Sequence, residues 1–314
     1  MQTVSWPIPA ELEKTARENY RTAYALRLKS RSAVDIVREL TFDGASPHIE
    51  VSDIENLLSF VERHFLNRPF SGTGIEVGAG PLVFSALLAR RSSVDCMYGV
   101  EICRPIIEQL FPVVASGIAY SDAKKLVGAI GSFDDMRLDD ASIDFVFDFF
   151  SLHHSDDISV TFKEIARVLR PGGFLLMLDK ARPDSYTDGD LDELMDAPCG
   201  PELYRRFGFD PARALTRRQN GEREYRRYDW HQACLGAGFA RFEHWHLARP
   251  TGSSRTASAK RLMSKLPLVT QRFLTRLLPS PSARHKFVLE PSDRVFISPL
   301  EPFHKEMSLM IAYR

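Results

Sequence analysis

Short apolar runs that alternate with helical patterns constrain the fold of this chain more than any other feature of its sequence. Each run has the length of one strand, and helical patterns separate most consecutive runs. Strands that are connected through helices pair in parallel, and the helices then cover both faces of the sheet. This order therefore predicts an α/β fold with a mostly parallel sheet. The predicted strands are Gly74–Gly78, Val94–Glu101, Lys125–Ile130, Asp144–Phe149, Phe174–Asp179, Phe239–Leu247 and Met307–Tyr313.

The first seventy residues have a different pattern. Residues 9–40 have apolar positions at helical spacing, and Ser52 with Glu55 resembles a capping box at the start of a second helix. No strand pattern precedes residue 74. We therefore expect a helical N-terminal extension or lid over residues 1–70, followed by one domain over residues 71–314.

Two segments are longer than the connections of a minimal sheet. Residues 181–227 and 249–305 separate predicted elements without adding an obvious strand or helix to the sheet. Connections of this length in a compact domain are usually functional or disordered. We expect both to be insertions that form a cap over the bound substrate.

Composition excludes several classes of protein. The 41 basic and 41 acidic residues give a net charge of zero, which argues against general nucleic-acid binding. The four cysteines have no metal-ligand spacing, and we expect His244 and His246 to be a pair on a sheet face, so no metal is predicted. No apolar run is long enough to span a membrane, and the N-terminus does not resemble a signal peptide, so we expect a cytoplasmic protein.

The turn after the first predicted strand carries the most informative motif, Glu76-Val-Gly-Ala-Gly80-Pro81. Gly78 and Gly80 allow a tight turn and a close approach to a ligand, and Pro81 suits the first position of a helix. Glu101 ends the second strand, 21 residues beyond Gly80, where a carboxylate can accept hydrogen bonds from ribose hydroxyls. Because both strands end at the same edge of the sheet, the two features predict a nucleoside-containing ligand there. A tight turn without a ligand and a solvated carboxylate are the alternatives.

Three stretches together resemble the class I S-adenosylmethionine-dependent methyltransferases, in particular their small-molecule branch. The third glycine of a dinucleotide-binding G-x-G-x-x-G turn is replaced by Val83, and the acid Glu76 stands two residues before Gly78. The resemblance covers residues 72–180 and resumes at 228–247. The stretches that carry it are E-x-G-x-G at 76–80 with Glu101, the run from Gly131 to His154 that ends in Leu-His-His, and Glu164-Ile-Ala-Arg-Val-Leu-Arg-Pro-Gly-Gly173.

This resemblance implies a Rossmann-like, seven-stranded, mostly parallel sheet and S-adenosylmethionine as the cofactor. It implies that residues 76–80 and 148–149 face the methionine part of the cofactor, that Glu101 binds the ribose, and that residues 102 and 132–133 face the adenine. Two positions depart from the family pattern. Leu82 replaces a third glycine, and Ser132 replaces an aspartate whose contact Asp134 could supply. The implied cofactor-binding residues are Glu76, Gly78, Ala79, Gly80, Glu101, Ile102, Ser132, Phe133, Asp148 and Phe149.

The residues that act on the methyl acceptor are less specified. His153 and His154 follow the fourth strand and are the candidates for a general base, although the pair could instead shape the site. Tyr20 and Tyr24 lie one helical turn apart in the extension and could cover the acceptor, or could pack the helix onto the sheet.

Charge is unevenly distributed near the C-terminus. Residues 244–289 contain nine Lys or Arg residues and no Asp or Glu, and residues 259–278 have an amphipathic pattern. Such a segment can lie on a membrane surface or bind an anionic ligand, or it can be a solvated face that pairs with the protein's own acidic surface.

We therefore expect methyl transfer to an oxygen, nitrogen or carbon atom of a small organic molecule, a specialised metabolite with an anionic or lipid-like part being one such acceptor. We expect this small molecule to be the binding partner, and we expect no binding of nucleic acid. Two alternatives remain open at this point: a nicotinamide-dependent oxidoreductase, and a non-catalytic cofactor-binding protein with the same fold.

Overall fold

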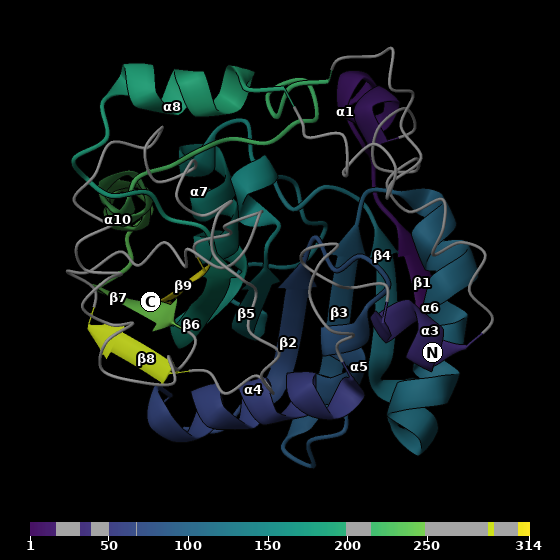
Figure 1. Cartoon of the computed structure of the whole chain (residues 1–314). Helices are drawn as coiled ribbons and strands as arrows, with labels where there is room; N and C mark the ends of the chain where they lie inside the picture. The colour runs from purple at the N-terminus through teal and green to yellow at the C-terminus, as the bar shows by residue number, and fades with distance from the viewer. Residues whose placement is uncertain (17–31, 39–49, 67, 199–214, 249–287, 292–306) are drawn as a thin grey trace, which may run out of the picture.

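A sheet of nine strands forms the centre of the described structure (Figure 1). The computed structural model describes residues 1–16, 32–38, 50–66, 68–198, 215–248, 288–291 and 307–314. The spatial order is β1-β4-β3-β2-β5-β6-β9-β7-β8. The strands are β1 (Gln2–Ser5), β2 (Gly72–Val77), β3 (Val94–Glu101), β4 (Leu126–Ile130), β5 (Ile143–Phe149), β6 (Leu169–Asp179), β7 (Arg241–Ala248), β8 (Val288–Pro291) and β9 (Met307–Tyr313).

The strands from β1 to β6 pair in parallel, and β9 runs antiparallel between β6 and β7. The central strand is β2, in which Glu76 pairs with Gly99 of β3 on one side and with Phe147 of β5 on the other. The chain proceeds outward from β2 through β3 and β4, and then resumes on the opposite side with β5. The order of the strands therefore reverses beside β2, which is where open α/β sheets bind ligands.

Helices cover both faces of this sheet. One apolar cluster packs α4 (Val51–His64), α5 (Val83–Ala89) and the helical run 106–119 on one face, and a second packs α7 (Ile158–Val168) and α10 (Arg227–Gly236) on the other. The short helices α1 (Ala10–Thr15) and α8 (Asp188–Asp196) lie beyond the carboxyl ends of the strands (Figure 1). The α/β class and the helices on both faces are thus as predicted.

The number of strands differs from the prediction: the described residues contain nine, not seven. The two additional strands, β1 and β8, have four residues each and lie at opposite edges of the sheet. A short edge strand pairs on one side only and needs no continuous apolar run, so it leaves little pattern in the sequence. The prediction of an entirely helical extension is accordingly wrong for Gln2–Ser5.

The predicted capping box at Ser52 is also wrong. The helix α4 begins at Val51, so Ser52 lies inside its first turn instead of preceding it. The remainder of the predicted extension is represented by α1 and by α3 (Ala33–Arg38), and residues 17–31 and 39–49 lie outside the described residues. No helix in the described part of the chain is both long and apolar enough to span a membrane.

The turn between β2 and α5 adopts left-handed backbone at Gly78, Gly80 and also at Leu82, which has a φ of 64°. Left-handed backbone costs a residue with a Cβ about 1–2 kcal/mol. The Leu82 side chain is fully buried and lies over Gly99, where an added Cβ would be 2.4 Å from Leu82 Cδ2. The chain therefore keeps the backbone that a third glycine would favour, and it uses the side chain to fill space above β3.

Candidate functional site

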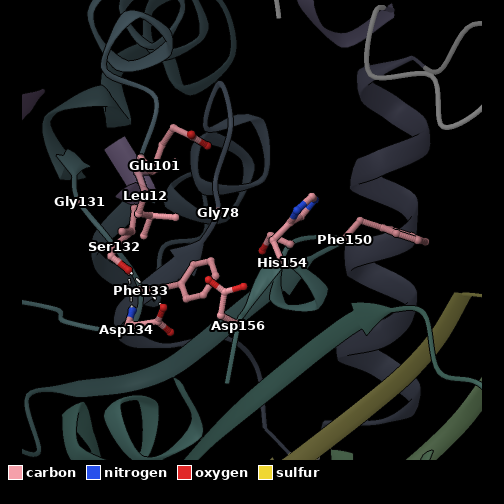
Figure 2. A pocket seen from close by; sticks show the side chains of 13 residues that line it. Leu12, Gly78, Glu101, Gly131, Ser132, Phe133, Asp134, Phe150, His154 and Asp156 are labelled. Atoms are coloured by element: carbon pink, nitrogen blue, oxygen red, sulfur yellow. Dashed lines mark hydrogen bonds between the residues drawn. The ribbon is translucent and has the colours of Figure 1, made fainter. Parts of the chain in front are cut away.

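A pocket lies at the carboxyl ends of the central strands, where β2, β3, β4 and β5 end next to one another (Figure 2). Its empty volume, including solvent at its mouth, is about 750 Å³, within the range of small-molecule and cofactor sites. Ser132, Phe133 and Asp134 lie on one side, and His154 and Phe150 lie on the other (Figure 2). The lining residues are Leu12, Gly78, Val100, Glu101, Ile102, Gly131, Ser132, Phe133, Asp134, Phe150, Ser151, His154 and Asp156.

The glycine turn lies directly against the start of the segment that follows β5. A Cβ added to Gly78 would lie 2.2 Å from Ser151 Cβ, and the φ of Gly78 is 58°. The Ser151 hydroxyl donates to the Val77 carbonyl at 2.6 Å, and the Ala79 N–H donates to the Val100 carbonyl at 2.8 Å. The turn is thus fixed to both neighbouring strands, and only a glycine at position 78 permits this close approach.

Glu101 lines the pocket and is held by the backbone around it. Its Oε2 accepts the Gly80 N–H at 2.9 Å, and its Oε1 accepts the Cys103 N–H at 2.8 Å. Burial raises the pKa of Glu101 to about 7, although these hydrogen bonds act in the opposite direction. The carboxyl group therefore lies at the predicted position beside the glycine turn, with both oxygens oriented by backbone N–H groups.

Glu76 does not line the pocket and points toward the first turn of α5. Its Oε2 accepts the backbone N–H of Ser85 at 2.7 Å and also the Ser85 hydroxyl. Burial raises the pKa of Glu76 to about 8. The position of Glu76 behind the turn indicates that it holds α5 against β2. Ala79 and Gly80 also lie outside the pocket lining, and they contribute backbone N–H groups to the bonds that fix the turn.

The wall after β4 combines a hydroxyl, an aromatic ring and a carboxylate. The Asp134 N–H donates to Ser132 Oγ at 3.1 Å, and the Thr161 hydroxyl donates to Asp134 Oδ1. Ser132 and Asp134 both line the pocket, with Phe133 between them. A carboxylate is therefore present on this wall two positions after Ser132, as the sequence suggested for Asp134.

Asp148 lies at the end of β5 and is fully buried. Its Oδ1 accepts hydrogen bonds from the Ser151 N–H at 3.1 Å and the Leu152 N–H at 3.0 Å, and it shares the single Ser151 hydroxyl proton with the Val77 carbonyl. Its Oδ2 has no hydrogen-bond partner among the described residues. Burial, and then the nearby charge of Asp179, raises the pKa of Asp148 well above its usual range. A buried oxygen of this kind needs a donor, preferably a cationic one.

Phe149 stacks on Phe84 of α5 with 4.3 Å between ring centroids, and it is the next residue, Phe150, that lines the pocket. Phe150 has a φ of 53°, so the backbone turns abruptly after β5 and presents this ring on the pocket side. The sequence motif therefore predicted the correct segment. This backbone turn determines that Phe150, and not Phe149, faces the pocket.

The two histidines occupy different positions. His153 is buried, and its Nδ1 lies 2.7 Å from Asp179 Oδ1 while its backbone N–H donates to Asp179 Oδ2 at 3.0 Å. His154 lines the pocket, and its Nδ1 lies 3.0 Å from the Gly221 carbonyl oxygen. Burial, followed by the charge of His153, lowers the pKa of His154 to about 3. His154 is therefore a neutral ring at the pocket surface, with His153 behind it.

Several lining residues did not emerge from the sequence. Phe150 and Ser151 lie inside the matched stretch and could have been found from their position after the fourth strand, whereas Leu12 comes from α1 and carries no sequence signal. Asp179, which holds His153, stands at the end of a predicted strand. Its pairing with His153 depends on β5 and β6 being neighbours.

Some predicted features lie outside the described residues. These are Tyr20, Tyr24 and residues 249–287, which include the amphipathic segment 259–278. Within the described part of the chain, no group of three or more His, Cys, Asp or Glu side chains is arranged to hold a metal ion. His244 contacts Ser308 of β9, with 2.8 Å between Nε2 and Oγ.

Comparison with known proteins identifies related sequences and folds. The methyltransferase domain family matches residues 75–177. A demethylmenaquinone methyltransferase of Roseiflexus castenholzii is 29% identical over 115 residues, which are 37% of this chain and 45% of that protein. The chain thus matches less than half of the length of this relative.

Solved structures share the fold at low sequence identity. The YcgJ protein of Bacillus subtilis superposes with a TM-score of 0.50 at 15% identity, covering 84% of this chain and 98% of that one. A geranyl diphosphate methyltransferase in complex with GPP and sinefungin also has a TM-score of 0.50, at 14% identity, covering 98% of this chain and 100% of that one. At such identities the similarity supports the fold alone.

Proposed function

We propose that this chain, which carries a class I S-adenosylmethionine-dependent methyltransferase domain, binds S-adenosylmethionine in the described pocket and transfers its methyl group to a small organic molecule. The sequence match, the fold and the glycine turn at the switch point support the family. The activity of the whole chain and its acceptor are the proposal.

One observation carries the choice of cofactor: the described lining contains three carboxyl side chains and no Lys or Arg. Asp148 adds the buried Oδ2 without a partner among the described residues. S-adenosylmethionine carries a sulfonium and an ammonium group against a single carboxylate, so it has a net positive charge that such a lining attracts. A nicotinamide dinucleotide would instead bring a pyrophosphate, for which the described lining offers no cationic side chain. We therefore favour the methyl donor over the nicotinamide alternative.

The residues of this pocket, together with the fully buried Asp148 outside its lining, could hold the parts of the cofactor as follows. Glu101 would accept hydrogen bonds from the ribose hydroxyls, and Asp148 Oδ2 would accept one from the ammonium group. Ile102 and Phe133 offer apolar surface to the adenine. Asp134, on the same wall as Ser132, would accept a hydrogen bond from the adenine amine.

Bound S-adenosylmethionine supplies a methyl group already activated by its positively charged sulfur, so the protein has to orient the acceptor more than activate it. Among the described residues that line the pocket, His154 is the one with a basic side chain. Because a carbonyl oxygen can only accept, the ring donates its Nδ1–H to Gly221, which leaves the lone pair of the neutral ring on Nε2. The Nε2 atom of His154 can therefore take a proton from the molecule that receives the methyl group.

A weakly basic histidine is sufficient for a hydroxyl acceptor. When a hydroxyl oxygen gains a methyl group it becomes positively charged, and its proton then becomes strongly acidic. The lowered pKa of His154 still allows this proton to be taken. An amine acceptor would keep its proton more tightly after methylation, so among oxygen, nitrogen and carbon atoms we favour a hydroxyl oxygen.

The acceptor should have an apolar part. Leu12, Phe133 and Phe150 give the described lining apolar surface. Two similar proteins are named for demethylmenaquinone and geranyl diphosphate as substrates. We propose a lipid-like acceptor, and the basic residues 244–289 would bind an anionic group of it or a membrane surface. Replacing Lys265, Arg272 and Arg276 with Glu should then raise the KM for an anionic acceptor.

The deciding experiment uses calorimetry and labelled cofactor. S-adenosylmethionine and its demethylated product should bind, while NAD and NADP should not. Incubation with methyl-labelled cofactor and extracts of the native host should yield a methylated small molecule that mass spectrometry identifies. Binding without transfer to any extract would favour the non-catalytic alternative, and binding of NAD alone would favour the oxidoreductase.

A further inference from the structure

Residues 215–226, called the strap below, belong to the insertion 181–227 and contact the segment that carries the two histidines. The Arg223 N–H donates to the His153 carbonyl at 2.8 Å. The Tyr225 hydroxyl donates to the Ser155 carbonyl at 2.8 Å, and Arg223 forms an ion pair with Asp156. Together with the contact between Gly221 and His154, these bonds attach the strap to every residue from 153 to 156.

Buried charges hold the strap against the end of β6. Glu224 is 3% exposed and accepts hydrogen bonds from Arg182 Nε at 2.6 Å, from Lys180 Nζ at 3.1 Å and from Arg217 at 2.6 Å. The Lys180 ammonium also donates to Glu222 at 2.9 Å. Burial alone would raise the pKa of Glu224, but Arg182 and Lys180 outweigh it and keep the carboxylate ionised.

This cluster has a geometric consequence for the pocket. Gly221 has a φ of 77°, a conformation that favours glycine, and its carbonyl oxygen faces His154 Nδ1. Three charged or titratable groups act on the His154 ring: His153 from its own segment, Lys180 from directly after β6, and Glu222 from the strap. A ring fixed by a carbonyl on Nδ1 keeps one tautomer, and a histidine in a catalytic site needs a defined one.

We propose that the strap is a positioning element for His154, in which Glu224 and its cationic partners hold the Gly221 carbonyl where it accepts Nδ1–H and leaves Nε2 as the basic atom. This inference rests on the proposed function in one respect, the use of His154 on the acceptor. Gly221 and Glu224 are then positioning residues, and the insertion contributes to the chemistry as well as covering the acceptor.

The test observes the His154 ring itself, in the full chain labelled with ¹⁵N-histidine. The His154 resonances are assigned by their loss in His154→Gln. In the unaltered chain they should show the Nδ1–H tautomer alone and no titration down to pH 5. In Gly221→Ala and Glu224→Gln they should show mixed tautomers and begin to titrate between pH 5 and 7.

Gly238→Ala is the matched control, because Gly238 also has a positive φ, of 88°, and an added Cβ there would meet no atom within 4 Å. It should leave the His154 resonances unchanged. If Glu224→Gln does not fold, Gly221→Ala and its control decide the question. An unaltered chain with mixed tautomers, or a Gly221→Ala chain that keeps the single tautomer, overturns the proposal.

Kinetics separate this inference from the proposed function. Both strap variants should lower kcat about tenfold, with the Kd of S-adenosylmethionine unchanged, because general bases contribute about 10²–10⁴-fold. A changed tautomer with unchanged kcat would refute the role of His154 in methyl transfer and leave the positioning by the strap intact. An unchanged tautomer would refute the positioning, whatever the turnover.

Discussion

At the scale of single residues, the proposed function depends on one buried oxygen of Asp148. Its Oδ1 accepts two backbone N–H groups, of residues 151 and 152, and lies against the Ser151 hydroxyl, whereas Oδ2 lacks a partner among the described residues. A buried carboxyl oxygen without a donor is costly in the free protein. Under the proposed function, the ammonium group of the cofactor would supply this donor and recover the cost.

Replacing Asp148 with Asn should therefore weaken binding of S-adenosylmethionine strongly. A hydrogen bond to a charged group contributes about 1.5–3 kcal/mol, which predicts a Kd higher by roughly 10- to 100-fold. Calorimetric titration of both chains measures the change. Asp192→Asn is the matched control, since Asp192 is exposed, pairs with Arg218 and lies outside the pocket lining, and it should change the Kd by less than about threefold. Equal effects of the two substitutions would contradict the role of Asp148.

At the scale of elements, the connection between β2 and α5 depends on Leu82 as much as on the glycines. Leu82 keeps left-handed backbone and is buried above Gly99 of β3. The glycine at position 99 is therefore a packing requirement, because its missing side chain leaves the space that Leu82 fills. The sequence pattern alone showed only that a family glycine was absent at position 82.

Gly99→Ala should destabilise the chain, because the new Cβ would lie 2.4 Å from Leu82 Cδ2 and 3.2 Å from Ala79 Cβ. Overpacking of this kind typically costs about 1–3 kcal/mol of the free energy of unfolding. Denaturant unfolding followed by circular dichroism measures it. Gly236→Ala, where an added Cβ would meet nothing within 4 Å, should be neutral or slightly stabilising. A Gly99→Ala chain as stable as this control would show that Leu82 can move.

Strands that pair with a neighbour on each side were predictable, because most of their residues are buried and form a continuous apolar run. The β9 prediction, Met307–Tyr313, has the observed bounds, and β4 begins one residue later than predicted. The edge strand β1 was missed because its residues 2–5 are mostly exposed and carry no strand pattern. The strap had no recognisable pattern either, since many of its bonds go to residues 42 to 70 positions away.

At the scale of the whole molecule, the raised pKa values of buried acids should make both the free energy of unfolding and the affinity for the cofactor depend on pH. The pKa of Glu76 is about 8 and that of Glu101 about 7, against an ordinary value of 4.5. Above pH 4.5 the unfolded chain has lost these protons while the folded chain still holds them. The folded state then binds more protons, so its stability falls as pH rises until the folded pKa values are passed.

The lowered pKa of His154 makes the free energy of unfolding rise with pH, but only below the ordinary histidine pKa of 6.5. In that range the unfolded histidine is protonated and the folded one is not. The clearest window is therefore pH 6.5 to 8. There the free energy of unfolding of the free protein should decrease with pH, by at most about 1.4 kcal/mol per pH unit for each group that holds its proton.

Bound S-adenosylmethionine should reduce this decrease, because its positive charges favour the ionised form of Glu101, and its affinity should accordingly rise between pH 6 and 8. Thermal and denaturant unfolding with and without cofactor measure the first effect. Calorimetry in buffers of different ionisation enthalpy detects the proton released on binding. Glu101→Gln should remove that release, and a pH-independent Kd in the unaltered chain would show that Glu101 is already ionised.

The sequence by itself determined the α/β class, the glycine turn, the strand-end acid and the segment that carries His153 and His154. These follow from local patterns, because strand and helix periodicity and turn residues act over a few neighbouring positions. Only the tertiary structure decided that His154 faces the pocket, that Asp179 holds His153, and that Asp148 Oδ2 has no hydrogen-bond partner among the described residues. These features depend on which strands become neighbours and on which groups lose access to water, and both are set by packing of the whole chain.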